Sequence, residues 1–123
     1  MPAHNNQFGK LGEDIASNYL IKKGYKILQR NYRISKVEID LICETAEEIV
    51  FVEVKTRTSD QMAYPEQAVG KAKQKNIRFA ATYFLEEKEI SKPARFDIIA
   101  VVKNEKRFDI EHIEDAFYPF DVI

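Results

Sequence analysis

Three ionisable residues interrupt stretches that are otherwise apolar, and their types suit the chemistry of a divalent cation. Asp40 lies between two aliphatic residues, while Glu53 and Lys55 alternate with valines. If these stretches pair as strands through the short turn at 44–48, Asp40 and Glu53 lie almost opposite each other. Two carboxylates so placed repel, and burial raises the free-energy cost unless a cation compensates them. Lys55 is one such cation, and a hard ion such as Mg²⁺, which binds carboxylate oxygens, is a better one.

The alternative is an ordinary cross-strand ion pair on a solvated sheet face, which is common in proteins. The distribution of charge along the chain favours the cation site, although the formal net charge is only -1. Residues 1–36 carry seven Lys or Arg and two acids, residues 37–54 carry six acids and no base, and residues 55–80 carry six bases and two acids. An acidic block between two basic ones would repel a nucleic acid unless a cation mediates.

Further charged residues are candidates for the same site or for a phosphate-binding surface. Glu13 lies at the edge of the apolar stripe of a predicted helix, from which it leans over the sheet; the alternative is a solvated acid near the helix N-terminus. Lys73 has a similar edge position on a second predicted helix. Lys71, Lys75 and Arg78 align on the outer face of that helix, either as a phosphate-contacting ridge or as a solvated face. Both readings stay open.

The hydrophobic periodicity predicts the elements that must position these residues. In order, we expect a helix over 8–23, strands over 25–33, 36–43 and 48–57, a helix from Pro65 to about Glu87, a strand over 95–103 and a short last strand over 108–113. Short connections favour an antiparallel meander for the first three strands, and the second helix is a crossover long enough to make the next strand parallel. The order αβββαβ indicates an α/β fold with a mixed central sheet flanked by helices.

Two of these elements carry specific burial patterns. The strand over 36–43 alternates strictly, which predicts one face made of Val37, Ile39, Leu41 and Cys43. The second helix is expected to bury a stripe made of Ala68, Val69, Ala72, Phe79, Ala80 and Tyr83. In the later strand, Asp97 either extends the acidic site or pairs with Arg95, and we favour the ion pair.

Composition limits the class of protein. The 123 residues, 45% of them hydrophobic, suffice for a single domain over 1–123 with its core at about 8–117. The one cysteine, Cys43, excludes an intramolecular disulfide and a Cys-based zinc cluster. No apolar run approaches the roughly 18 residues of a membrane span, and the first ten residues are polar. We therefore expect a cytoplasmic protein that does not enter a membrane.

Several motifs together resemble the PD-(D/E)xK nuclease superfamily and, more closely, the YraN-like family of small bacterial predicted endonucleases, which is described as Holliday-junction-resolvase-like. The motifs are Gly12-Glu13, Glu38-Ile39-Asp40-Leu41-Ile42 and Phe51-Val52-Glu53-Val54-Lys55. Supporting stretches are Arg30-Asn31-Tyr32-Arg33, Lys73-Gln74, Arg95-Phe96-Asp97 and Asp115-Ala116-Phe117. The resemblance covers about residues 8–117 and implies a restriction-endonuclease-like core. Val37 departs from the pattern, because relatives place glycine before Glu-Ile-Asp.

The resemblance implies a site for Mg²⁺ or Mn²⁺ and a hydrolytic reaction. Asp40 and Glu53 would bind the metal, with the Val54 carbonyl as a further ligand and Glu13 completing the acidic cluster. Lys55 would orient the attacking water or help to deprotonate it. The reaction would be phosphodiester hydrolysis that leaves a 5′-phosphate and a 3′-hydroxyl.

The implied partner is DNA, branched or otherwise structured, or single-stranded. Two basic blocks would grip its backbone without reading sequence. They contribute Arg30, Arg33, Arg57, Lys71, Lys73, Lys75 and Arg78. A four-way junction needs two active sites, so a homodimer is expected. The alternative is a catalytically silent nucleic-acid-binding or adaptor protein on the same fold, which would not depend on Asp40, Glu53 or Lys55.

Overall fold

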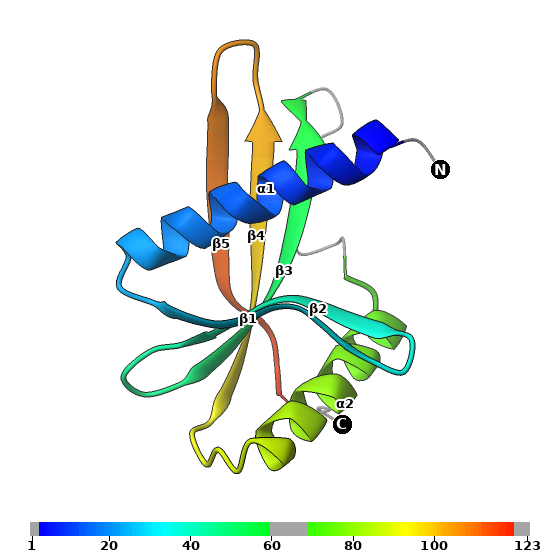
Figure 1. Ribbon diagram of the computed structural model, residues 1–123, viewed down its shortest axis with the longest axis vertical. Coiled ribbons are helices and arrows are strands. Elements are labelled where there is room, and N and C mark those ends of the chain that lie inside the picture. The colour runs from blue at the N-terminus through cyan, green and yellow to red at the C-terminus, as the bar shows by residue number, and fades with distance from the viewer. Residues whose placement is uncertain (1–2, 60–68, 120–123) are drawn as a thin grey trace.

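A mixed sheet with one helix on each face organises the chain (Figure 1). The computed structural model describes residues 3–59 and 69–119, with side chains from Gln7 onward. Within these ranges the elements are α1 (Ala3–Lys22), β1 (Lys26–Ile34), β2 (Val37–Glu44), β3 (Ile49–Thr58), α2 (Lys71–Glu87), β4 (Ala94–Lys103) and β5 (Phe108–Phe117). No helix in the described part of the chain is long and apolar enough to cross a membrane.

The strand order is β1-β2-β3-β4-β5. The pairs β1–β2, β2–β3 and β4–β5 are antiparallel, whereas β3 and β4 are parallel and are linked through α2. The predicted α/β class, the meander and the crossover helix are therefore confirmed, and the arrangement is consistent with a restriction-endonuclease-like core. The last strand extends beyond the expected 113 to Phe117, with a register irregularity before its end.

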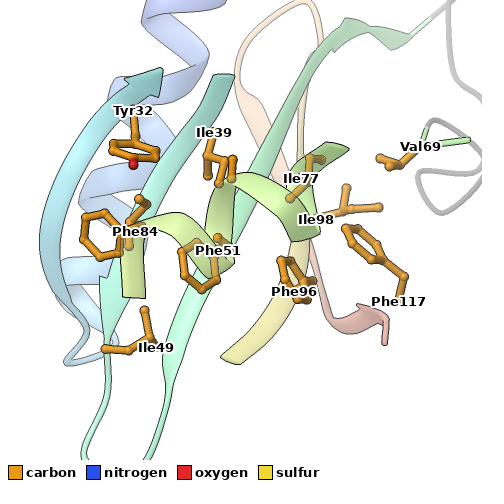
Figure 2. Packing of buried hydrophobic residues seen from close by; sticks show 13 residues of the cluster. Tyr32, Ile39, Ile49, Phe51, Val69, Ile77, Phe84, Phe96, Ile98 and Phe117 are labelled. Atoms are coloured by element: carbon orange, nitrogen blue, oxygen red, sulfur yellow. The ribbon is translucent and has the colours of Figure 1, made fainter. Parts of the chain in front are cut away.

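Each face of the sheet has its own apolar core. On the α1 side, Ala16 and Leu20 of the helix pack on the sheet, and α1 runs across β3, β4 and β5 (Figure 1). On the α2 side, Phe84 contacts the rings of Tyr32 and Phe51 edge-on. Figure 2 shows this second cluster, in which aromatic and aliphatic side chains from the strands meet α2. The two cores fix both helices against β3, the strand that carries Glu53 and Lys55.

The predicted second helix was wrong in its start and in part of its buried stripe: Val69 and Ala80 are buried as expected, and Ala68 lies outside the described residues. The helix begins at Lys71 after Gly70, and Val69 lies outside it; residues 65–68 are outside the described ranges. Phe79 and Tyr83 are exposed, and Ala72 is exposed as well. The residues that α2 buries are Ile77, Ala80, Ala81 and Phe84. These four residues recur at i, i+3, i+4 and i+7 and therefore form one continuous helical face, whereas the predicted set does not keep this spacing.

The expected strict alternation in β2 was also wrong. Ile39 and Ile42 belong to the core on the α2 side, while Leu41 and Cys43 belong to the core on the α1 side. In a regular strand, residues two apart such as Ile39 and Leu41 point to the same face. Here they point to opposite cores, so the alternation of side chains is interrupted between them. The residue at this interruption is Asp40.

Candidate active site

An open cavity of about 420 Å³ lies at the end of β3 where β2 leaves it. Three elements line it: α1, β2 and β3. The lining residues are Phe8, Gly9, Glu13, Asp40, Glu53, Val54, Lys55, Thr56 and Arg57. The four residues expected to be catalytic and the expected carbonyl ligand are therefore gathered around one space.

The separation of β2 from β3 places the two carboxylates. The ladder between these strands ends at the pair Leu41–Val52; one residue further, the register would pair Asp40 with Glu53. There the Val54 N–H donates to Oδ2 of Asp40 at 2.8 Å. The Asp40 carboxylate accepts the hydrogen bond that a backbone carbonyl of β2 would accept in a continued ladder. The two strands therefore separate at this point, and the cavity lies between them.

Burial and like charge act together on Asp40. Burial, together with the charges of Glu53, Glu13 and Glu38, raises the pKa of the Asp40 carboxyl to about 7, against the lowering effect of the Val54 N–H. Near neutral pH this carboxyl is thus balanced between its two protonation states. A cation bound beside it would favour the ionised form.

Glu53 is buried, with 8% of its surface exposed, and is compensated by two lysines. Lys55 Nζ lies 3.1 Å and Lys73 Nζ 2.5 Å from the same oxygen, Oε2. Burial lowers the pKa of Lys55 despite its pairing with Glu53. Burial also acts to lower the pKa of Lys73, but the hydrogen bond and charge of Glu53 outweigh it and raise this pKa.

Lys73 has the edge position on α2 that the sequence predicted. Its Nζ contacts Glu53, so the residue completes the site around this carboxylate. Lys71 and Lys75 do not share this position, and the DNA-binding role expected for all three lysines stays a prediction.

Asn31 of β1 is a site residue that the sequence reasoning missed. Its amide Nδ2 donates to Glu13 Oε1 and to Glu38 Oε2, both at 3.0 Å, so it ties α1 to the entrance of β2. Its φ of 51° lies in the left-handed region, which asparagine tolerates better than most residues. The available signals were an asparagine inside a strand-like stretch and its place in the supporting motif Arg30-Asn31-Tyr32-Arg33.

The remaining basic candidates divide into two groups. Arg30 is 2.7 Å from Asp14 and 3.9 Å from Glu13, and Arg33 is 3.6 Å from Glu38, so both arginines face acids. Arg57 lines the cavity, and its guanidinium donates to the Thr56 carbonyl.

On α2, the outer basic residues lie away from the acids of the cavity. Lys71 and Lys75 are exposed, and Arg78 donates to the Tyr118 carbonyl at 3.4 Å. Of the residues predicted to contact DNA, these three therefore lie on the outer side of α2.

The oxygen donors of the cavity suit a small hard cation. Among the described residues, no three His, Cys, Asp or Glu side chains form a ready-made metal cluster. Mg²⁺ needs fewer than three such side chains, because one or two carboxylates hold it and water molecules fill several of its coordination positions. In an extended strand the N–H and C=O of one residue point to the same side, so the Val54 carbonyl points to the side of Asp40. Asp40, Glu53 and this carbonyl therefore fit Mg²⁺ or Mn²⁺.

Asp97 does not belong to this cavity. It is 1% exposed, accepts two hydrogen bonds from Arg95, and lies 2.7 Å from His112 Nε2. The backbone N–H of Asp115 donates to it as well. The expected ion pair with Arg95 is confirmed, and the group is a buried polar cluster under the end of α1.

Comparison with known proteins agrees with the motifs. The profile of the uncharacterised protein family UPF0102 matches residues 12–101. A UPF0102 protein of Phocaeicola vulgatus is 44% identical over 117 residues, which is 95% of this chain and 97% of that one. Relatives from Flavobacterium psychrophilum and Clostridioides difficile are each 44% identical, over 96% and 93% of this chain and 99% of their own lengths. The chain therefore belongs to the UPF0102 family, as its YraN-like motifs indicated.

Proposed function

We propose that this protein is a metal-dependent endonuclease that hydrolyses phosphodiester bonds in DNA. The observation that carries the proposal is the meeting of Asp40 and Glu53 from neighbouring strands in one open cavity, with Lys55 3.1 Å from Glu53 and Glu13 across from them. Buried carboxylates beside a lysine with a lowered pKa are typical of catalytic sites.

Asp40, Glu53 and the Val54 carbonyl would hold Mg²⁺ or Mn²⁺. When bound, such an ion lowers the pKa of a water molecule and neutralises the charge that develops on the phosphoryl group. The Val54 N–H fixes the Asp40 carboxylate through Oδ2, which leaves Oδ1 for the ligand. Glu13 adds negative charge at the rim and is held there by Asn31.

Lys55 is the residue best placed to act on the attacking water. Its Nζ is held by Glu53, and burial has lowered its pKa, so the amine accepts and returns a proton more easily than an exposed lysine does. Lys73 is more exposed than Lys55 and can leave Glu53 for a phosphate when a cation takes its place. Arg57 supplies a further positive charge at the cavity wall.

A catalytically silent DNA-binding protein is the second candidate function. One observation favours it: Lys55 and Lys73 already compensate Glu53, so this carboxylate is stable in the fold without a metal. Such a protein would bind DNA through the same basic residues and would not need Asp40. The two functions therefore differ in their dependence on a metal and on this residue.

The test is cleavage of labelled four-way junction, flap, single-stranded and duplex DNA with Mg²⁺, Mn²⁺ or EDTA. The nuclease predicts cutting that needs the metal and is lost in Asp40→Asn and Lys55→Ala. Glu111→Gln, a change at an exposed carboxylate outside the cavity, should cut like the wild type. Binding without cutting under every condition would favour the silent protein. Paired cuts at a four-way junction would in addition require a homodimer, which sedimentation measures directly.

A further inference from the structure

One row of side chains on the outer side of α2 combines positive charge with exposed aromatic rings. Residues four apart in a helix are neighbours on the same face. The row consists of Lys71, Lys75, Phe79 and Tyr83. All four are exposed, and the two aromatic residues keep 56% and 45% of their surface accessible. Large aromatic side chains usually bury most of their area, so two of them exposed on adjacent turns point to a ligand.

The row begins on the turn of α2 that contacts the candidate active site through Lys73, but on the opposite side of the helix. Lys73, which lies between the two lysines in sequence, points inward and contacts Glu53. With a rise of 1.5 Å per residue, Phe79 lies about 9 Å and Tyr83 about 15 Å further along the helix axis than Lys73. The lysines of the row are therefore level with the cavity, and the rings lead away from it.

This order of side chains fits an unpaired nucleic-acid strand. Lysines bind phosphates, and aromatic rings stack on bases of any identity. In a duplex, neighbouring bases about 3.4 Å apart cover one another's faces. Side chains on adjacent turns of the row are separated by about 6 Å along the axis. A strand that stacks on both rings must therefore have its bases splayed apart, which paired DNA does not allow.

We propose that the row of α2 binds a single-stranded DNA segment, with bases stacked on Phe79 and Tyr83 and phosphates held by Lys71 and Lys75. The biological role of this row rests on the proposed nuclease function, because the row would lead the unpaired strand of a branch or flap to the cavity. The strand binding itself needs neither metal nor catalysis. Glu86 and Glu87 follow Tyr83 and repel phosphates, so the track ends at this ring.

A second copy of the chain is the competing occupant of the exposed rings. The centre of a protein interface is depleted of charged residues, and lysine is among those most strongly excluded. Two of the four side chains in the row are lysines, so the chemistry of the row favours the nucleic acid. The dimer is kept as an outcome of the test.

The test is fluorescence anisotropy with a labelled oligothymidylate and a labelled duplex of equal length, in EDTA so that nothing is cut. Phe79→Leu and Tyr83→Leu keep apolar side chains but lose the rings, and each should weaken oligothymidylate binding about tenfold. Phe79→Tyr and Tyr83→Phe keep the rings and should bind like the wild type. Ile21→Ala, which removes an exposed apolar side chain from α1, is the matched control and should have no effect.

Three results would overturn the proposal. They are leucine variants that bind oligothymidylate like the wild type, an equal loss in Ile21→Ala, and leucine variants that convert a dimeric wild type into monomers while strand affinity stays unchanged. The proposed nuclease fails separately, if no DNA is cut with Mg²⁺ or Mn²⁺. Ring-dependent strand binding in a protein that does not cut would support the row and reject the nuclease.

Discussion

The backbone N–H of Val54 donates to Oδ2 of Asp40 at 2.8 Å, at the point where β2 leaves β3. A carboxylate thus takes the position of a strand carbonyl. The same group ends the ladder, holds the edge of β3 and lines the cavity. Fold and site are therefore coupled through one side chain, and its protonation should be visible in the stability of the protein.

The first prediction concerns the pH dependence of stability. The pKa of Asp40 is raised to about 7 in the fold, against about 3.9 in an unfolded chain. The folded state binds this proton more tightly, so the free energy of unfolding falls as the pH rises from about 4 to about 7 and is then level. Asp40→Asn keeps an acceptor for Val54 without the charge. It should be more stable than the wild type by about 4 kcal/mol at about pH 8 and equal to it at about pH 4.

Urea denaturation across this pH range measures the difference. Glu111→Gln, at an exposed carboxylate of β5, is the control and should follow the wild type. Parallel curves for Asp40→Asn and the wild type would show that the folded protein does not hold the Asp40 proton.

The second prediction concerns the inward-pointing lysine. Lys73 Nζ occupies Glu53 Oε2 at 2.5 Å, so a cation that binds this oxygen must displace it. Lys73→Met should therefore bind Mn²⁺ more tightly, by about threefold to tenfold, because the competing charge is gone. Titration calorimetry measures the change, and Lys75→Met on the outer side of α2 is the matched control. Equal affinities for Lys73→Met and the wild type would place the metal away from Glu53.

Much of the site was predictable because it depends on local sequence. The short turn at 45–48 fixes the β2–β3 register, so Asp40 and Glu53 had to lie near each other. The two-residue spacing of Glu53 and Lys55 puts both on one face of β3 whatever surrounds the strand. The order of helices and strands was likewise readable from periodicity and connection length.

The parts that were not predictable depend on tertiary geometry. The rotation of α2 is set by the fit of Phe84 against Tyr32 and Phe51, and it decides that Lys73 points inward. The left-handed φ of Asn31 and the change of direction at Asp40 occur together where two strands bend. Periodicity treats each strand as regular and therefore misses both.

The third prediction compares two glycines of α1. A Cβ at Gly12 would lie 2.0 Å from Thr56 Oγ1 and 2.9 Å from Thr56 Cβ. Rotating the threonine cannot relieve the second contact, so Gly12→Ala must move α1 away from β3 and Glu13 with it. We expect a loss of about 1–3 kcal/mol in stability, together with reduced cleavage.

Gly9→Ala is the matched control, since a Cβ there meets nothing within 4 Å. It should raise stability by up to about 1 kcal/mol, because alanine is the better helix former. Urea denaturation compares the two variants, and the cleavage assay compares Gly12→Ala with the wild type, because Gly9 itself lines the cavity. A Gly12→Ala protein that is as stable as Gly9→Ala and as active as the wild type would show that α1 does not need this close approach.

The last prediction concerns the buried cluster around Asp97. Burial raises the pKa of this carboxyl, but the bonds from His112, Arg95 and the Asp115 N–H outweigh it, so the pKa is lowered in the fold. A carboxyl whose pKa is lowered in the fold stabilises the protein at pH values above its unfolded pKa of about 4. This stabilisation is lost as the pH falls through the pKa of the folded state. Asp97→Asn should cost about 3 kcal/mol at neutral pH and less near pH 3. Because Asp97 does not line the cavity, the variant should bind Mn²⁺ like the wild type wherever it is folded. Weaker Mn²⁺ binding by the folded variant would mean that the cluster and the cavity are coupled through β4 and β3.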